Sequence, residues 1–234
     1  MDTFLREKNL IGSEKLDVLK NSAVAVFGLG GVGSYVCEAL ARAGVGMLML
    51  CDNDVVAEHN INRQLFALHS TVGRFKTQVA AERIKDINPE VELDLRTEYY
   101  CEDNEKSFDF SAYDFVADCI DSVTSKIRLI VNAKAAGVSV ISSMGTGNKL
   151  YQNFVVTDLY KTQTCPLAKV LRRELKKRGV DELKVVYSSE PPAKPLNAVA
   201  GERKQTPASI SFVPATAGLI IAGEIVRNLL KVGL

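Results

Sequence analysis

Short apolar runs alternate with amphipathic segments over residues 21–147. The apolar runs predict buried strands at 24–27, 47–51, 91–96, 115–119 and 139–144. Apolar positions at helical spacing predict helices at 32–43, 75–87, 102–108 and 124–136. Such alternation is typical of the α/β class, so we expect a Rossmann-like, doubly wound, mostly parallel sheet with helices on both faces.

The pattern changes after Gly147. We expect a strand at 152–157, a basic helix at 166–178 and a further strand at 184–187. The polar stretch 189–209 is long for a loop without structure of its own, which indicates a functional segment. An apolar helix at 215–230 follows, so the fold is expected to carry a C-terminal strand and helix extension.

The chain of 234 residues fits one domain. Within this single domain, 1–234, the pattern distinguishes an N-terminal arm (1–20), a core (21–147) and an extension (148–234).

The formal net charge of +1 indicates no polyanionic partner by itself, so any basic surface must be local. The five cysteines form no CxxC pair, so we expect neither zinc nor a disulfide framework. No apolar signal region opens the chain, which favours the cytoplasm. The apolar run 215–230 is short for a membrane span of about 20 residues and carries charges, which favours a buried or subunit-interface helix over a membrane anchor.

A glycine motif lies between the first predicted strand and the first predicted helix. Gly28 permits a tight turn, Gly30 lets phosphate approach the backbone, and Gly33 lets helix and strand pack closely. The helix N-terminus then offers N–H groups to a phosphate. Asp52 ends the next strand, where a carboxylate accepts hydrogen bonds from ribose hydroxyls. These residues predict a nucleotide site without deciding between NAD and ATP.

The residues after Asp52 favour ATP. Arg63 and Lys76 bring positive charge beside the expected phosphates, and such charge stabilises a departing pyrophosphate. Asp121 follows the fourth strand, at the edge where open α/β sheets bind ligands. A carboxylate there is suited to Mg²⁺ that bridges phosphate oxygens.

These motifs resemble the ubiquitin-activating-like superfamily of adenylating enzymes over about residues 4–145. The resemblance is carried by the glycine motif 28–33, Asp52-Asn53-Asp54, Asn60-x-Asn62-Arg63-Gln64, Val72-Gly73-x-x-Lys76, Ile87-Asn88-Pro89 and Asp118-x-x-Asp121-Ser122. It implies that ATP is held by Gly28, Gly30, Gly31, Gly33, Asp52, Asp54, Asn60 and Gln64. It implies catalytic roles for Arg63, Lys76 and the metal ligand Asp121, and for Arg6, which would reach the partner's site in a homodimer.

The extension resembles the branch of tRNA threonylcarbamoyladenosine dehydratases. The similarity is carried by 155–159, by the run from Lys161 to Arg172 and by 186–191. It implies ATP-dependent dehydration of threonylcarbamoyladenosine 37 in tRNA to its cyclic form, through carboxylate adenylation and intramolecular ring closure. A monovalent cation and a sulfur-relay protein are further expected partners of this branch.

Other functions stay open at this stage. A sulfur-carrier adenylyltransferase that activates a C-terminal glycine is the first alternative, although such enzymes usually have two zinc-binding CxxC pairs. An NAD-linked oxidoreductase and a non-catalytic tRNA-binding module are the others. Some dehydratases of the branch carry a cysteine before the last helix, whereas residues 201–214 contain none. Cys165 is the one thiol expected in a loop, at a helix start that lowers thiol pKa values.

The basic helix 166–178 is amphipathic, with leucines on one face. Its other positions, with nearby cations, form an expected tRNA-binding surface that comprises Lys161, Lys169, Arg172, Arg173, Lys176, Lys177, Arg203 and Lys204. The competing interpretation is an ordinary solvated helix face.

Overall fold

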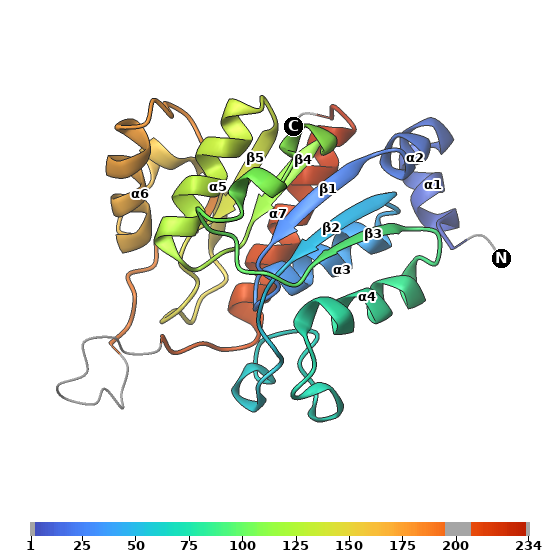
Figure 1. The fold of residues 1–234 in the computed structure, drawn as a ribbon, viewed down its shortest axis with the longest axis horizontal. Helices are drawn as coiled ribbons and strands as arrows, with labels where there is room; N and C mark the ends of the chain where they lie inside the picture. Colours follow the sequence, from blue (N-terminus) through green and yellow to red (C-terminus); the bar gives the residue numbers. More distant parts are fainter. Residues whose placement is uncertain (1–2, 195–206, 233–234) are drawn as a thin grey trace.

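One seven-stranded sheet forms the centre of the molecule (Figure 1). The computed structural model describes residues 3–194 and 207–232. Its strands run in the order β3-β2-β1-β4-β5-β7-β6. The bounds are β1 (Ala23–Phe27), β2 (Met47–Cys51), β3 (Glu92–Arg96), β4 (Phe115–Asp118), β5 (Ser139–Ser143), β6 (Phe154–Asp158) and β7 (Lys184–Ser188). Every pairing is parallel except β6 with β7, which confirms the predicted fold class.

Helices cover both faces of the sheet (Figure 1). The longer ones are α3 (Gly33–Arg42), α4 (Lys76–Ile87), α5 (Val123–Ala135), α6 (Pro166–Lys176) and α7 (Phe212–Leu229). The arm holds α1 (Leu5–Ile11) and α2 (Ser13–Lys20). Short 3-10 turns complete the described elements at η1 (Glu58–Asn60), η2 (His69–Thr71), η3 (Glu105–Ser107), η4 (Phe110–Ala112) and η5 (Leu159–Lys161).

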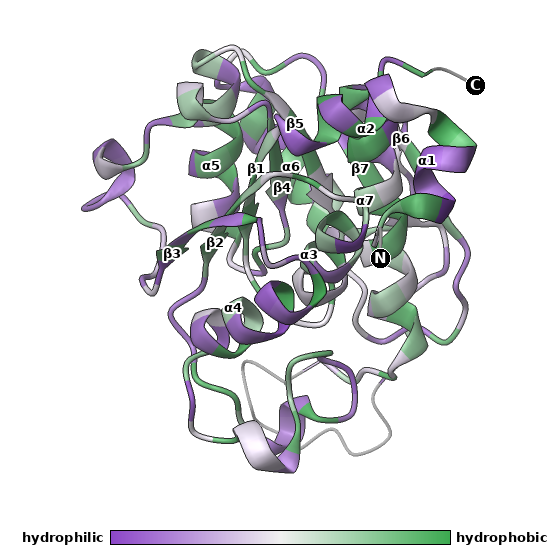
Figure 2. Ribbon diagram, turned by 90° about the vertical axis from the view of Figure 1, so that its right-hand side faces the viewer, coloured by the Kyte–Doolittle hydropathy of each residue, from purple (hydrophilic) through white to green (hydrophobic). Residues whose placement is uncertain are grey.

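Alternate residues of the central strands supply two apolar layers. Val24 and Val26 of β1 pack in the layer that holds α3, α4 and α7. Ala25 and Phe27 pack in the opposite layer, with α5 and α6. Because successive side chains of a strand point to opposite faces, a strand covered on both faces must be apolar throughout. Figure 2 shows hydrophobic residues along the central strands and hydrophilic residues on α4.

The predicted helix 102–108 is wrong. The chain there forms only the 3-10 turn η3, and the Asn104 side chain accepts the backbone N–H of Cys101 at 2.9 Å. Phe108 then packs on Phe27 and Tyr100, with ring centroids 5.5 and 5.1 Å apart. The local side-chain hydrogen bond and the burial of the aromatic ring outweigh the helical pattern.

The helix α7 lies along α3 in the apolar core. By length and composition alone, α7 is apolar and long enough to cross a membrane, and 39% of it is buried inside the structure. Contact with α3 is so close that a Cβ on Gly218 would lie 2.4 Å from the Val32 carbonyl oxygen. This contact places the C-terminal helix directly behind the glycine turn that ends at α3.

Gly218→Ala is therefore expected to destabilise the protein by about 1–3 kcal/mol, because a methyl group there forces α7 away from α3. Gly223→Ala in the same helix is the matched control, since its Cβ would meet only the flexible Arg227 side chain at 3.4 Å. Urea unfolding of both variants measures the difference. Equal stability of the two variants would contradict the close packing of α7 on α3.

Candidate functional site

A cavity of about 530 Å³ opens at the carboxyl ends of β1, β2 and β4. The strand order reverses between β1 and β4, which is where open α/β sheets bind ligands. Predicted ATP-site residues from distant parts of the sequence meet on its wall, namely Gly28, Gly30, Gly31, Asp52, Asp54, Asn60, Arg63, Gln64, Lys76 and Asp121. Gly33 lies just behind this wall, against the Gly28 carbonyl.

The glycine turn is compressed against the end of β4. Gly28 has φ +86°, and a Cβ on it would lie 2.8 Å from the Cys119 carbonyl oxygen. A Cβ on Gly33 would lie 1.7 Å from the Gly28 carbonyl oxygen, so only glycine fits either position. In the described part of the chain, the N–H groups of Gly30, Gly31 and Val32 donate to no acceptor. These donors at the start of α3 are suited to phosphate oxygens.

Asp52 is fixed by two backbone donors at the end of β2. One carboxylate oxygen accepts the N–H of Leu29 at 2.7 Å and the other accepts that of Asp54 at 2.8 Å. Burial raises the pKa of Asp52 above its ordinary value, against the opposing effects of Lys76 and these backbone donors. The carboxylate keeps lone pairs for ribose hydroxyls, since each oxygen has two.

Lys76 begins α4 and is only 4% exposed. Its ammonium lies 2.6 Å from an Asp54 oxygen and 3.8 Å from an Asp52 oxygen. A buried cation needs such partners, because an unpaired one carries a large desolvation cost. The pairing holds a positive charge at the cavity wall, where a triphosphate would find it.

Asn60 ends η1, and Arg63 and Gln64 follow it; the three side chains have different tasks. The Asn60 side-chain oxygen accepts the N–H of Ala57 at 3.0 Å, so it closes the turn and leaves the amide group as a donor. Arg63 donates to the His59 carbonyl at 2.8 Å and to the Asn62 side chain at 3.0 Å. Both bonds use the same terminal nitrogen, which leaves the other guanidinium donors for phosphate. Gln64 is 8% exposed, and its side-chain nitrogen would lie 3.7 Å from a Cβ on Gly30.

Asp121 is exposed on the cavity wall just past the end of β4. Within the described ranges its carboxylate forms no hydrogen bond or ion pair. The described residues also contain no cluster of three or more His, Cys, Asp or Glu placed to hold a metal ion. One free carboxylate that faces a phosphate site fits Mg²⁺, since this ion usually binds through one or two carboxylates and the phosphates.

A buried ion pair fixes the loop that carries Asp121. Lys126 and Asp118 are both 0% exposed, and their charged atoms are 2.8 Å apart. Lys126 also donates to the Ser142 hydroxyl at 3.2 Å and to the Ser143 carbonyl at 3.1 Å. The second Asp118 oxygen accepts the N–H of Ile120 at 3.2 Å. The pair therefore joins the loop after β4, the first turn of α5 and the end of β5.

Part of the cavity wall was not predicted from the sequence. Glu98 and Tyr99 follow β3, and the Tyr99 hydroxyl accepts from Ser125 of α5 at 2.9 Å. Their place at the end of a parallel strand is a signal that sequence reasoning could have used. Further wall residues come from the segment after β5, the segment before α7 and the first turn of α7, and no motif marks them: Thr146, Gly147, Pro207, Ser209 and Pro214.

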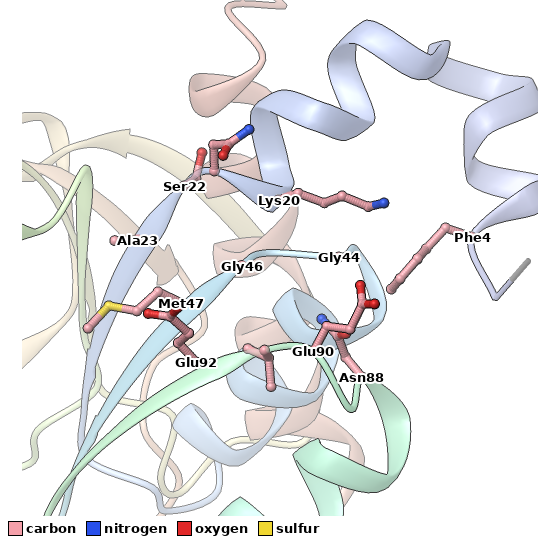
Figure 3. Close-up of a pocket in the computed structure, with 12 residues that line it drawn as sticks. Phe4, Lys20, Ser22, Ala23, Gly44, Gly46, Met47, Asn88, Glu90 and Glu92 are labelled. Atoms are coloured by element: carbon pink, nitrogen blue, oxygen red, sulfur yellow. The ribbon is translucent and has the colours of Figure 1, made fainter.

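Arg6 lies on α1, at the opposite edge of the sheet. Phe4 lines a second cavity of about 320 Å³ beside the amino ends of β1, β2 and β3 (Figure 3). Arg6 is exposed and does not line the ATP-site cavity of its own chain. An action of Arg6 on nucleotide therefore requires the cavity of another copy.

The predicted tRNA-binding residues divide into four groups. Lys161, Lys169 and Lys176 are exposed. Arg173 and Lys177 share Glu174 with Arg178, and these cations, Arg173 first, lower the pKa of Glu174 to about 2. Arg172 is half-buried and donates to the Thr162 carbonyl at 2.9 Å, so it fixes the loop before α6. The last two, Arg203 and Lys204, lie outside the described residues.

Cys165 is 4% exposed at the N-cap position of α6 and does not line the cavity. Two other thiols do line it, those of Cys51 and Cys119. Burial raises the pKa of Cys119 to about 12, so this thiol stays protonated at neutral pH. The cavity therefore provides no thiolate nucleophile among the described residues.

Comparison with known proteins agrees with this site. The tRNA threonylcarbamoyladenosine dehydratase of Bacillus subtilis is 42% identical over 97% of this chain and 94% of its own length. The crystal structure of the Escherichia coli tRNA N6-threonylcarbamoyladenosine dehydratase TcdA in complex with AMP is 32% identical, with a TM-score of 0.90, over 98% of this chain and 94% of that one. A complex of TcdA with ATP gives a TM-score of 0.88. A family model described as the ThiF family matches residues 4–234, and the chain belongs to this family.

Proposed function

We propose that this protein uses ATP to dehydrate N6-threonylcarbamoyladenosine at position 37 of tRNA to its cyclic form. The observation that carries the proposal is the cavity where phosphate donors, Asp52, Arg63, Lys76 and Asp121 converge. The similarity to tRNA threonylcarbamoyladenosine dehydratases along nearly the whole chain supplies the substrate. The complexes of TcdA with ATP and AMP support the choice of nucleotide.

The first step is adenylation. The threonyl carboxylate of the modified adenosine attacks the α-phosphorus of ATP, and the bond to pyrophosphate breaks. Arg63, Lys76 and the N–H groups of the glycine turn stabilise the negative charge on the departing pyrophosphate. Asp121, with phosphate oxygens, would hold Mg²⁺, and this ion would neutralise further charge on the phosphates. Asp52 orients the ribose.

The second step is ring closure. A ureido oxygen or nitrogen of the same side chain attacks the activated acyl carbon, and the bond from this carbon to the AMP oxygen breaks. AMP leaves with one of the original carboxylate oxygens, and the ureido group releases an N–H proton to solvent. Both reacting groups belong to one side chain, so proximity supplies much of the rate. The protein has to exclude water, because water would hydrolyse the adenylate. No protein nucleophile is required, which fits a cavity whose thiols are protonated.

We further propose that the protein acts as a homodimer in the cytoplasm. Arg6 lies far from its own cavity, so it would complete the site of the partner subunit. Leu5 and Leu10 on the same helix are 53% and 84% exposed, which suits a helix that packs against a second copy. The arginine would add positive charge beside the phosphates.

The basic surface of α6 and η5 would hold the tRNA backbone. Lys161, Lys169 and Lys176 have no partner among the described residues, so their ammonium groups are available to phosphates. Contacts of this kind give salt-dependent affinity with little sequence preference. Selection of the modified adenosine would then come from capture of an unstacked loop nucleotide.

Asp121→Ala should reduce the dehydration rate by about 100-fold or more, the typical loss for a group that stabilises transition-state charge. Mass spectrometry of nucleosides from threonylcarbamoylated tRNA measures the loss of one water. Asp103→Ala is the matched control, because Asp103 is an exposed aspartate away from the cavity. Loss of tRNA binding by Asp121→Ala, instead of turnover, would contradict the assigned role.

Lys169→Glu/Lys176→Glu should raise the KM for tRNA by at least about 10-fold at low salt while the KM for ATP stays unchanged, because both residues contact only tRNA phosphates. The dependence of tRNA affinity on salt should weaken by about one unit of slope for each lost contact. Lys106→Glu, at an exposed lysine on η3, controls for a charge reversal elsewhere on the surface. A similar rise in KM for that control would contradict binding at α6.

A further inference from the structure

Asn148 adopts an unusual backbone conformation between β5 and β6. Its φ is +58°, in the left-handed region that favours glycine. Asparagine tolerates this region better than most residues, because its short polar side chain bonds to nearby backbone. Such conformations persist only where the surrounding contacts hold them, and they gather at functional sites.

Three hydrogen bonds connect Asn148 to residues far along the chain. Its backbone N–H donates to the Ala208 carbonyl at 2.7 Å, and its side-chain oxygen accepts the Ala208 N–H at 2.7 Å. Its own carbonyl accepts the N–H of Ala193 at 2.7 Å. Asn148 thus forms hydrogen bonds with both the N–H and the carbonyl of Ala208. The left-handed conformation places the N–H and the side-chain oxygen of Asn148 on the same side, towards Ala208.

This attachment forms one wall of the ATP-site cavity. Pro207 and Ser209, the neighbours of Ala208, line the cavity, as does Gly147 before Asn148. The fit is close, since a Cβ on Gly147 would lie 2.8 Å from the Pro207 Cβ. We call residues 207–209 the strip. The strip is also held by the Asn62 side chain, which donates to the Ser209 carbonyl at 3.1 Å.

The strip 207–209 lies at the phosphate end of the cavity. Asn62 precedes Arg63 and bonds to its guanidinium at 3.0 Å. Pro214, a short distance along the chain, would lie 3.1 Å from a Cβ on Gly31 of the glycine turn. Tyr99, after β3, and Ser125, in α5, also line the cavity but come from other elements. The strip therefore lies on the side of the cavity that holds Arg63 and the glycine turn.

We propose that Asn148 is a positioning residue that fixes 207–209 as the cavity wall beside the phosphates. The role rests on the proposed function, because the wall would orient the carboxylate of the tRNA and keep water from the adenylate. A loosened wall lets water compete with ring closure. The expected consequence is AMP released without cyclic product, and not merely a less stable protein.

Hydrogen–deuterium exchange of the Ala208 amide tests the attachment directly. Asn148→Gly keeps the left-handed backbone and removes the acceptor, so exchange should be about fivefold faster, as expected for one lost hydrogen bond. Asn148→Ala should exchange at least as fast, because it also disfavours the backbone conformation. Asn148→Asp keeps the acceptor and should exchange like the wild type. Bound ATP should slow this exchange in the wild type and in Asn148→Asp more than in the other two.

The ratio of AMP to cyclic nucleoside tests the functional consequence. It should rise severalfold in Asn148→Gly and Asn148→Ala and stay near the wild-type ratio in Asn148→Asp. Thr164→Gly is the matched control: Thr164 also has a positive φ, +57°, and donates to a backbone carbonyl, that of Ser189, but does not line the cavity. It should leave the ratio unchanged.

Two results would overturn the proposal. Wild-type exchange in Asn148→Gly would show that the side chain does not hold Ala208. Faster exchange with a wild-type ratio and no effect of ATP on exchange would show that the strip plays no part in the site. Wild-type protein that binds ATP but dehydrates no tRNA would contradict the proposed function separately. In that case, the effect of ATP on exchange of the Ala208 amide would decide whether Asn148 positions the strip 207–209 beside the nucleotide.

Discussion

The close approach of the glycine turn to the end of β4 is the constraint on which the site depends. Gly33 lies against the Gly28 carbonyl and Gly28 lies against the Cys119 carbonyl, with no room for a side chain at either glycine. This contact brings the N-terminus of α3 next to the loop that carries Asp121. Gly218 continues the same close packing on the far side of α3. The free N–H groups of the glycine turn and the Asp121 carboxylate meet because the backbones meet.

Two buried lysines fix the segments that surround the glycine turn. Lys76 ties the segment after β2 to the start of α4, and Lys126 ties the loop after β4 to the end of β5. Each has carboxylate partners, as a buried cation requires. Arg63 and Asp121, in contrast, keep donor or acceptor capacity towards the cavity. The pair of Lys126 and Asp118 is thus fully buried, whereas Lys76, Arg63 and Asp121 line the cavity.

The strand pattern predicted the sheet, and the motifs at the strand ends predicted most of the residues that line the cavity. Both predictions were possible because the glycine turn, Asp52 and Lys76 are marked by their local sequence context. The helix expected at 102–108 failed because Phe108 gains more from the aromatic cluster of Phe27 and Tyr100 than the segment gains from helical pairing. The wall at 207–209 was beyond prediction, since its place depends on hydrogen bonds to Asn148 and Asn62 across the fold. The hydrogen bond of Arg172 to Thr162 was also beyond prediction, because it joins the helix to the loop before it only in the folded chain.

The central claim is that this cavity joins a carboxylate to the α-phosphorus of ATP before ring closure. Threonylcarbamoylated tRNA with ¹⁸O in the threonyl carboxylate tests it most directly. Mass spectrometry of the released AMP should find one ¹⁸O atom per molecule, with unlabelled pyrophosphate, as the cyclic nucleoside forms. Unlabelled AMP accompanying the cyclic product would contradict adenylation of the carboxylate.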